Sequence, residues 1–132
     1  MLSNETVRLR ALEPEDIDLL YEWENDTGVW PVGQTLEPFS RFVLKEYIAQ
    51  ATSDIYEKRE LRLMIDARDS GLTVGTVDLF DFEPLHSRAG VGILVEKSQR
   101  RRQYALQSLL LLKKYAFSVL QLHQLYCNIR ED

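Results

Sequence analysis

The feature that most constrains the fold is a long apolar helix set between two short apolar strands near the C-terminal end of the sequence. Helical spacing of apolar residues runs from Gln103 to about Leu120, and strand-like runs flank it at 90–95 and 125–129. Two strands joined by a helix of this length are expected to lie parallel, with a right-handed connection. The sequence therefore predicts a sheet with at least one parallel pair of strands.

The residues before this strand–helix–strand segment show both helical and strand periodicity. Strand-like alternation marks 7–11, 60–67 and 73–82, and two amphipathic helices are expected within 13–25 and 39–51. The predicted element order is β-α-α-β-β-β-α-β. This order indicates an α/β chain of the α+β type, with a mixed, mostly antiparallel sheet whose fourth and fifth strands are parallel.

Composition narrows the classes of partner and of location. The sequence has 16 Lys and Arg against 21 Asp and Glu, a formal net charge of -5, so we expect no nucleic-acid partner. No apolar signal segment is visible at the N-terminus, and the longest apolar-rich stretch, 104–112, is too short to span a bilayer. We therefore expect no membrane contact and, by default, a cytoplasmic location. The single cysteine, Cys127, argues against an internal disulfide and a cysteine-rich zinc cluster.

Three consecutive arginines, Arg100, Arg101 and Arg102, stand directly before the long apolar helix. The N-terminus of a helix already carries a partial positive charge from its free N–H groups, so it ordinarily favours acidic residues. One interpretation is a solvated turn whose arginines face water. The other is a site for a phosphate or pyrophosphate, which the arginines and the backbone donors would bind together. The position of the run after a parallel strand favours the second interpretation.

The stretch "SQRRRQYALQSLLLLKKYAF" resembles the acetyl-CoA motif of the GNAT N-acetyltransferases, (Gln/Arg)-x-x-Gly-x-(Gly/Ala). Arg100 matches the first position and Ala105 the last, whereas Gln103 stands where the family usually has glycine. Within the family, the sequence is most similar to bacterial spermidine N-acetyltransferases and to relatives that acetylate ribosomal-protein N-termini. This likeness includes "VRLRALEPEDI", "GTVDLFDFEPLHSRAGVGILV" and "AFSVLQLHQLYCNI", and it extends over essentially the whole chain.

The resemblance implies the GNAT acyl-CoA N-acyltransferase fold and an N-acetyltransferase that uses acetyl-CoA as co-substrate and no metal. A primary amine, either a polyamine-like small amine or a protein amine, would attack the thioester directly. By the match, backbone groups of Ile93, Leu94 and Val95 pair with the pantetheine arm. The residues that match the pyrophosphate-binding motif are Arg100, Arg101, Arg102, Gln103, Tyr104 and Ala105.

Residues for the acceptor side are also implied by the resemblance. Asp78 lies in the third predicted strand, where the spermidine enzymes carry a glutamate, and Glu37 matches a glutamate of their acceptor loop. We expect Asp78 to anchor the amine or to act as a water-mediated base, the alternative being an exposed strand aspartate. Trp30 and the acidic residues before it form a candidate pocket for a polyamine or peptide, the alternative being a solvated helix end.

The family normally continues after the fifth strand with a helix, which carries a tyrosine proposed to protonate the thiolate, and a strand hairpin. We expect residues 1–132 to form a single domain that lacks these parts. Two alternatives to an active enzyme stay open: a catalytically impaired acyl-CoA-binding module, and a truncated remnant that acts through dimerisation. A homo-oligomer is expected, because the fifth strand would otherwise be an exposed edge. The arginine run argues against a dimerisation domain without a ligand.

Overall fold

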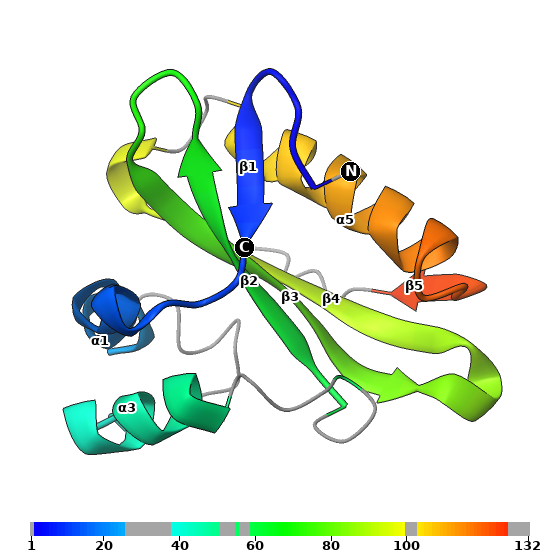
Figure 1. The fold of residues 1–132 in the computed structure, drawn as a ribbon, viewed down its shortest axis with the longest axis horizontal. Helices are drawn as coiled ribbons and strands as arrows, with labels where there is room; N and C mark the ends of the chain where they lie inside the picture. The colour runs from blue at the N-terminus through cyan, green and yellow to red at the C-terminus, as the bar shows by residue number, and fades with distance from the viewer. Residues whose placement is uncertain (1, 26–37, 51–54, 56–58, 100–102, 127–132) are drawn as a thin grey trace, which may run out of the picture. The chain divides into compact units, whose positions relative to one another are not determined.

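The structure is a computed structural model, which describes residues 2–25, 38–50, 55, 59–99 and 103–126 (Figure 1). The described residues divide into two compact units. The first takes its residues from Met1–Ala11 and Ile55–Asn128, and the second takes its residues from Leu12–Asp54. The candidate site residues that the structure describes all belong to the first unit.

The first unit is built on a five-stranded sheet in which the strands follow one another in sequence order (Figure 1). All neighbouring strands are antiparallel except β4 and β5, which are parallel. The predicted mixed sheet and its one parallel pair are thus confirmed. The strands are β1 (Val7–Arg10), β2 (Leu61–Ala67), β3 (Thr73–Glu83), β4 (Arg88–Val95) and β5 (Gln124–Tyr126).

One long helix, α5 (Tyr104–Ser118), packs against the sheet and makes the core with it. The predicted helix from Gln103 to about Leu120 is confirmed with slightly shorter bounds. Through the regular part of their pairing, odd-numbered residues of β3 and β4 face the helix, because side chains alternate between the two faces of a strand. Val74 and Phe82 of β3 also belong to the core, and they lie where the pairing of β3 is irregular. Core members on these two strands are Val77, Leu79, Ala89, Val91 and Ile93, and Leu111, Leu112 and Ala116 meet them from α5.

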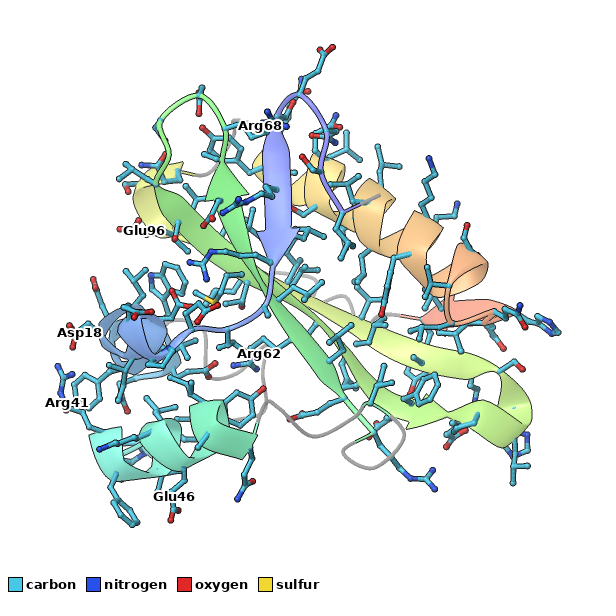
Figure 2. The ribbon with its side chains drawn as sticks, in the orientation of Figure 1. Asp18, Arg41, Glu46, Arg62, Arg68 and Glu96 are labelled. Atoms are coloured by element: carbon cyan, nitrogen blue, oxygen red, sulfur yellow. The ribbon has the colours of Figure 1, made fainter. Side chains whose placement is uncertain are left out.

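The second unit contains the two N-terminal helices, α1 (Ile17–Glu24) and α3 (Arg41–Gln50). A short 3-10 turn, η1 (Pro14–Asp16), precedes α1, so the helix predicted to begin near Pro14 starts with a tighter turn. An ion pair between Asp18 and Arg41 joins α1 to α3 (Figure 2), and the Arg41 guanidinium lies 4.3 Å from the centre of the Tyr21 ring. Polar surface contacts therefore help to hold this helix pair together.

Candidate active site

Among the residues that the structure describes, β4 is paired on both sides only near its first residues. It pairs with β3 at Arg88 and from Gly90 to Val95, whereas its described pairing with β5 covers Arg88–Gly90. The stretch from Val91 to Val95 thus lies beyond the last described β5 pair. This stretch includes Ile93, Leu94 and Val95, the residues expected to offer backbone groups to a ligand.

The hydrogen-bond pattern of β4 shows that the backbone groups of these three residues do not all face the same neighbouring strand. The N–H of Glu96 donates to the carbonyl of Val74 at 2.7 Å. Because hydrogen-bonded pairs alternate along an antiparallel ladder, the backbone groups of Leu94 also face β3. Those of Ile93 and Val95 then point to the opposite side, on which β5 runs. Within the predicted trio, Ile93 and Val95 direct their backbone toward that side, and Leu94 belongs to the β3–β4 ladder.

The helix α5 begins at a residue in a glycine-like conformation. Gln103, its N-terminal flanking residue, has φ 64° and ψ 9°, in the left-handed region. The N–H of Gln107 donates to the Gln103 carbonyl at 3.0 Å, which closes the first helical turn. A non-glycine residue in this region costs roughly 1–2 kcal/mol. The position where the resembling motif has glycine therefore keeps the conformation that glycine favours, although its side chain is larger.

The side chain of Tyr104 belongs to the core. Only 3% of Tyr104 is exposed, and its hydroxyl donates to the Asp69 carboxylate at 3.1 Å. Asp69 lies in the turn between β2 and β3, so this bond connects the start of α5 to that turn. Ala105, the next motif residue, is half-buried. The Tyr104 ring is therefore part of the core and is not exposed at the start of α5.

Asp78 lies on the face of the sheet opposite to α5, between two cross-strand neighbours. Arg62 on β2 is paired with it on one side, and Gly92 on β4 is paired with it on the other (Figure 2 labels Arg62). A β-carbon built on Gly92 would lie 2.9 Å from Oδ1 of Asp78 and 3.1 Å from Oδ2. The carboxylate therefore leans from β3 over the bare backbone of β4. Strand alternation places Arg62 and Gly92 on the same face as Asp78, but neither residue was among the predicted site residues.

An aromatic pair lies next to Asp78 on the same face. The ring of Phe80 covers Gly90, where an added β-carbon would come within 2.4 Å of the ring. The same ring meets Tyr126 of β5 edge to face, with centroids 6.1 Å apart and an interplanar angle of 85°. Aromatic rings in this geometry attract each other beyond the area they bury. Two glycines two residues apart on β4 are thus covered by two very different groups, a ring and a carboxylate.

A second acidic residue on this face, Asp66 on β2, is occupied by basic neighbours. Its carboxylate accepts hydrogen bonds from Arg10 at 2.8 Å, from Arg8 at 3.2 Å and from Thr73 at 2.7 Å. Burial raises the pKa of Asp66, but the hydrogen bonds from Thr73, Arg10 and Arg8 outweigh it and leave this pKa below its usual value. Asp66 therefore has its charge compensated within the protein.

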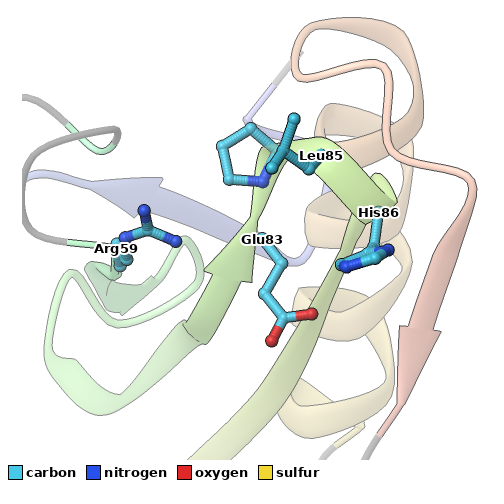
Figure 3. Close-up of a pocket in the computed structure, with 5 residues that line it drawn as sticks. Arg59, Glu83, Leu85 and His86 are labelled. Atoms are coloured by element: carbon cyan, nitrogen blue, oxygen red, sulfur yellow. The ribbon is translucent and has the colours of Figure 1, made fainter.

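A cavity of about 290 Å³ lies at the turn that joins β3 to β4 (Figure 3). It is lined by Arg59, Glu83, Pro84, Leu85 and His86. Glu83 forms an ion pair with Arg88 at 2.6 Å. The hydrogen bond from Arg88 holds the pKa of the Glu83 carboxyl below its usual value. This cavity is at the opposite end of β4 from Ile93–Val95 and contains none of the predicted site residues.

Several predicted residues lie outside the part of the chain that the structure describes. They are Trp30, Glu37, Arg100, Arg101 and Arg102. Among the described residues, no group of three or more His, Cys, Asp or Glu side chains is arranged to hold a metal ion. No helix in the described ranges is long and apolar enough to cross a membrane.

Known proteins share this sequence pattern and this fold. The sequence profile of the family described as "Acetyltransferase (GNAT) domain" matches residues 6–132. The spermidine N(1)-acetyltransferase of Escherichia coli (strain K12) is 29% identical over 137 residues, which cover 100% of this chain and 68% of that protein. The spermidine N(1)-acetyltransferase of Vibrio cholerae is 23% identical over 126 residues, covering 96% of this chain and 70% of that protein.

Solved structures agree on the fold. The spermidine N-acetyltransferase from Vibrio cholerae in complex with CoA and spermine superposes with a TM-score of 0.80 at 23% identity. That alignment covers 94% of this chain and 71% of the other. A dodecameric structure of spermidine N-acetyltransferase from the same organism has a TM-score of 0.76 at 23% identity, covering 96% and 71% of the two chains. The five-stranded sheet with its parallel β4–β5 pair is thus a known architecture.

Proposed function

The chain belongs to the GNAT family of acetyltransferases, and we propose that it transfers the acetyl group of acetyl-CoA to a primary amine. The observation that carries the proposal is the junction between β4 and α5. There, Gln103 takes a left-handed, glycine-like conformation at the start of the helix, at the position where the family's acetyl-CoA motif has glycine. A conformation that costs free energy, found at this motif position, supports retention of the motif's role.

We expect the cofactor to contact both parts of this junction, the end of β4 and the start of α5. Backbone groups of Ile93 and Val95, which point away from β3, would pair with the pantetheine arm as an added strand does. The N–H groups at the start of α5 would receive the pyrophosphate, since a helix N-terminus attracts anions. In this proposal Arg100, Arg101 and Arg102 supply the compensating positive charge.

The proposed chemistry needs no covalent enzyme intermediate. The amine loses a proton, and its nitrogen bonds to the thioester carbonyl carbon. The C–S bond then breaks, and CoA leaves as a thiol after taking up a proton. The protein's part is to hold both reactants close together and to favour the uncharged amine at the reacting carbon.

We propose that Asp78 anchors the acceptor amine. A primary amine reaches the protein mainly as an ammonium ion, which a carboxylate attracts. Asp78 is suited to this task because its carboxylate lies over β4, the strand that would bind the pantetheine arm. Glu37 and Trp30 complete the proposed acceptor side.

We further propose a polyamine as the acceptor and a homo-oligomer as the working form. The formal net charge of -5 suits a polycationic substrate. The related Escherichia coli and Vibrio cholerae proteins are spermidine N(1)-acetyltransferases, and one solved Vibrio cholerae structure is dodecameric.

Calorimetric titration with acetyl-CoA and desulfo-CoA tests the binding half of the proposal. Both are expected to bind with Kd below about 1 mM, which corresponds to more than about 4 kcal/mol. Thiol release is then measured with spermidine, spermine and N-terminal peptides, and the polyamines are expected to be the better acceptors. Binding without thiol release from any amine would favour an acyl-CoA-binding module. No binding of either ligand would contradict both functions.

A further inference from the structure

We propose that Gly75 on β3 is a positioning residue for the pantetheine arm of acetyl-CoA. Its missing side chain lets the end of β4 lie close against β3, and this fixes where the last residues of β4 can meet a ligand. The inference rests on the proposed use of acetyl-CoA. It concerns the place where Gly75 is paired with Val95.

The space that a side chain of Gly75 would fill is taken by the backbone of β4. A β-carbon built on Gly75 would overlap the carbonyl oxygen of Leu94, and it would lie 3.0 Å from the Leu94 carbonyl carbon and 3.0 Å from the Cα of Val95. Carbon atoms in ordinary contact are about 3.5–4.0 Å apart. Any side chain at position 75 would therefore force one of the two strands to move.

The two glycines of β4 differ from Gly75 in this respect. A β-carbon added to Gly90 would meet the ring of Phe80, and one added to Gly92 would meet the side chain of Asp78. A side chain can turn to another rotamer, whereas a carbonyl group moves only with its strand. Among the glycines that the structure describes, Gly75 is thus the one that constrains the path of a strand.

Backbone conformation does not explain the glycine at position 75. Of the glycines in the described ranges, only Gly71 has positive φ. Glycine weakens a strand because it adds conformational freedom to the unfolded chain, and within a strand it often marks the close approach of another backbone. The close approach of Leu94 is therefore the reason that the structure gives for glycine at this position.

If a side chain were present at position 75, β4 would be the strand that moves. The strand β3 is the middle strand of the five, and Gly75 is paired with Ile65 on its other side. Val74 and Val77, close to Gly75 on β3, have no exposed surface. Close-packed interiors resist such shifts. We therefore expect a methyl group at position 75 to push Leu94 away from β3.

The displaced residues are those proposed to bind the pantetheine arm. Leu94 lies between Ile93 and Val95, whose backbone groups would pair with the arm as an added strand does. Such pairing needs donors and acceptors at hydrogen-bond distance, so a small shift of the strand weakens it. The bare backbone of Gly75 thus keeps this edge of β4 where the arm can reach it.

The connection to α5 is anchored separately. Glu96, the residue after β4, donates its N–H to the carbonyl of Val74 at 2.7 Å, and its own carbonyl accepts the N–H of Gln99 at 2.8 Å. These bonds tie the short helix η3 (Lys97–Gln99) to β3. We therefore expect a shift at Leu94 to affect the site of the pantetheine arm more than the start of α5, where the pyrophosphate is proposed to bind.

Gly75→Ala tests the inference through calorimetric titration with two ligands. One is acetyl-CoA, and the other is 3′-phosphoadenosine 5′-diphosphate, which has the pyrophosphate but no pantetheine arm. The Kd of acetyl-CoA is expected to rise by about tenfold or more, because the hydrogen bonds to the arm are lost. The Kd of the nucleotide should change by less than about twofold. A general loss of stability would not discriminate between the two ligands.

Gly90→Ala is the matched control, because it adds the same methyl group to a glycine of the same sheet but presses on a side chain. It should lower the unfolding midpoint, as Gly75→Ala should, since both overfill a packed region. Its Kd for each ligand should stay within about twofold of the wild-type value.

A measurement on the wild type covers the case in which Gly75→Ala does not fold. With nitrogen-15 placed in glycine alone, the amide signal of Gly75 is expected to shift when acetyl-CoA binds, because the Leu94 carbonyl against it belongs to the strand that binds the arm. The nucleotide without the arm should leave this signal in place. A Gly75 signal that acetyl-CoA does not move would overturn the inference.

The outcomes separate the two proposals. A wild-type chain that binds neither ligand overturns the proposed function, and the inference with it. A wild type that binds acetyl-CoA, together with a Gly75→Ala variant of equal affinity, overturns the inference alone. So does a Gly75→Ala variant that loses affinity for both ligands equally, because Gly75 would then serve only the stability of the fold.

Discussion

The two ends of β4 resemble each other locally and differ in what their charges do. A residue in the left-handed conformation lies near each end. Ser87, with φ 51°, directly precedes β4 at the turn, and Gln103, with φ 64°, follows β4 at the start of α5. At the turn, Glu83 and Arg88 compensate each other in an ion pair. Toward the helix, Asp78 leans over Gly92, and three consecutive arginines follow in the sequence. Because both ends carry a left-handed residue, such a residue does not by itself mark a ligand site, and what distinguishes the helix end is the run of arginines in the sequence.

Replacing Arg100, Arg101 and Arg102 together with alanine should give the largest effect. Acetyl-CoA affinity is expected to fall by more than about tenfold, or about 1.4 kcal/mol, because the pyrophosphate loses its counter-charges. Calorimetric titration of the triple variant measures this change. Arg88→Ala at the other end of β4 is the control, and its Kd should match that of the wild type. Equal affinity of the triple variant and the wild type would assign the arginines to a solvated turn.

Glycine substitution at the two left-handed positions should separate backbone strain from ligand binding. Gln103→Gly and Ser87→Gly are each expected to raise the free energy of unfolding by about 0.5–1 kcal/mol. Glycine removes the strain of the left-handed conformation, and this gain is larger than the loss that comes from the greater freedom of glycine in the unfolded chain. Only Gln103→Gly should also tighten acetyl-CoA binding, by about threefold, since it removes a Cβ near the proposed phosphates. Denaturant unfolding and calorimetry measure the two effects. Tighter binding in both variants would break the contrast between the ends of β4.

Tyr104→Phe should affect stability without affecting binding. The loss of the hydroxyl that donates to Asp69 is expected to lower the free energy of unfolding by about 1 kcal/mol. Kd for acetyl-CoA should stay within about twofold of the wild-type value, because the ring belongs to the core. Urea denaturation and calorimetry on the same preparation measure both quantities. A marked loss of affinity at unchanged stability would instead place the hydroxyl at the ligand.

The smallest effect is expected from pH at the turn end of β4. The Arg88 hydrogen bond lowers the pKa of Glu83 below its ordinary value of 4.5. A lowered folded-state pKa adds stability above the unfolded pKa, and this stability is lost as pH falls through the folded-state value. The wild-type unfolding midpoint should therefore fall slightly more steeply below pH 4.5 than that of Glu83→Gln. High salt should remove the difference, because the pair is exposed. Identical pH profiles at low salt would show that the ion pair adds no stability.

Much of the fold follows from residue patterns along the chain. The alternation of Leu61, Leu63 and Ile65 predicts a strand, and the apolar spacing after Gln103 predicts the helix that forces β4 and β5 to be parallel. These patterns report which face of an element is buried, so they can be read locally. The bounds of the first helix were less predictable, since the choice between a 3-10 turn and an α-helix at Pro14 depends on single hydrogen bonds.

The candidate site was predicted only in part, and the reason is physical. The residue types can be read from the sequence alone: an acidic side chain at position 78, a run of arginines before an apolar helix, and glutamine in place of a motif glycine. The folded chain was needed to show that Gln103 takes the left-handed conformation, that the backbone groups of Ile93 and Val95 face away from β3, and that Asp78 lies over Gly92. These three facts depend on strand register and on packing between segments distant in sequence, which local patterns do not encode.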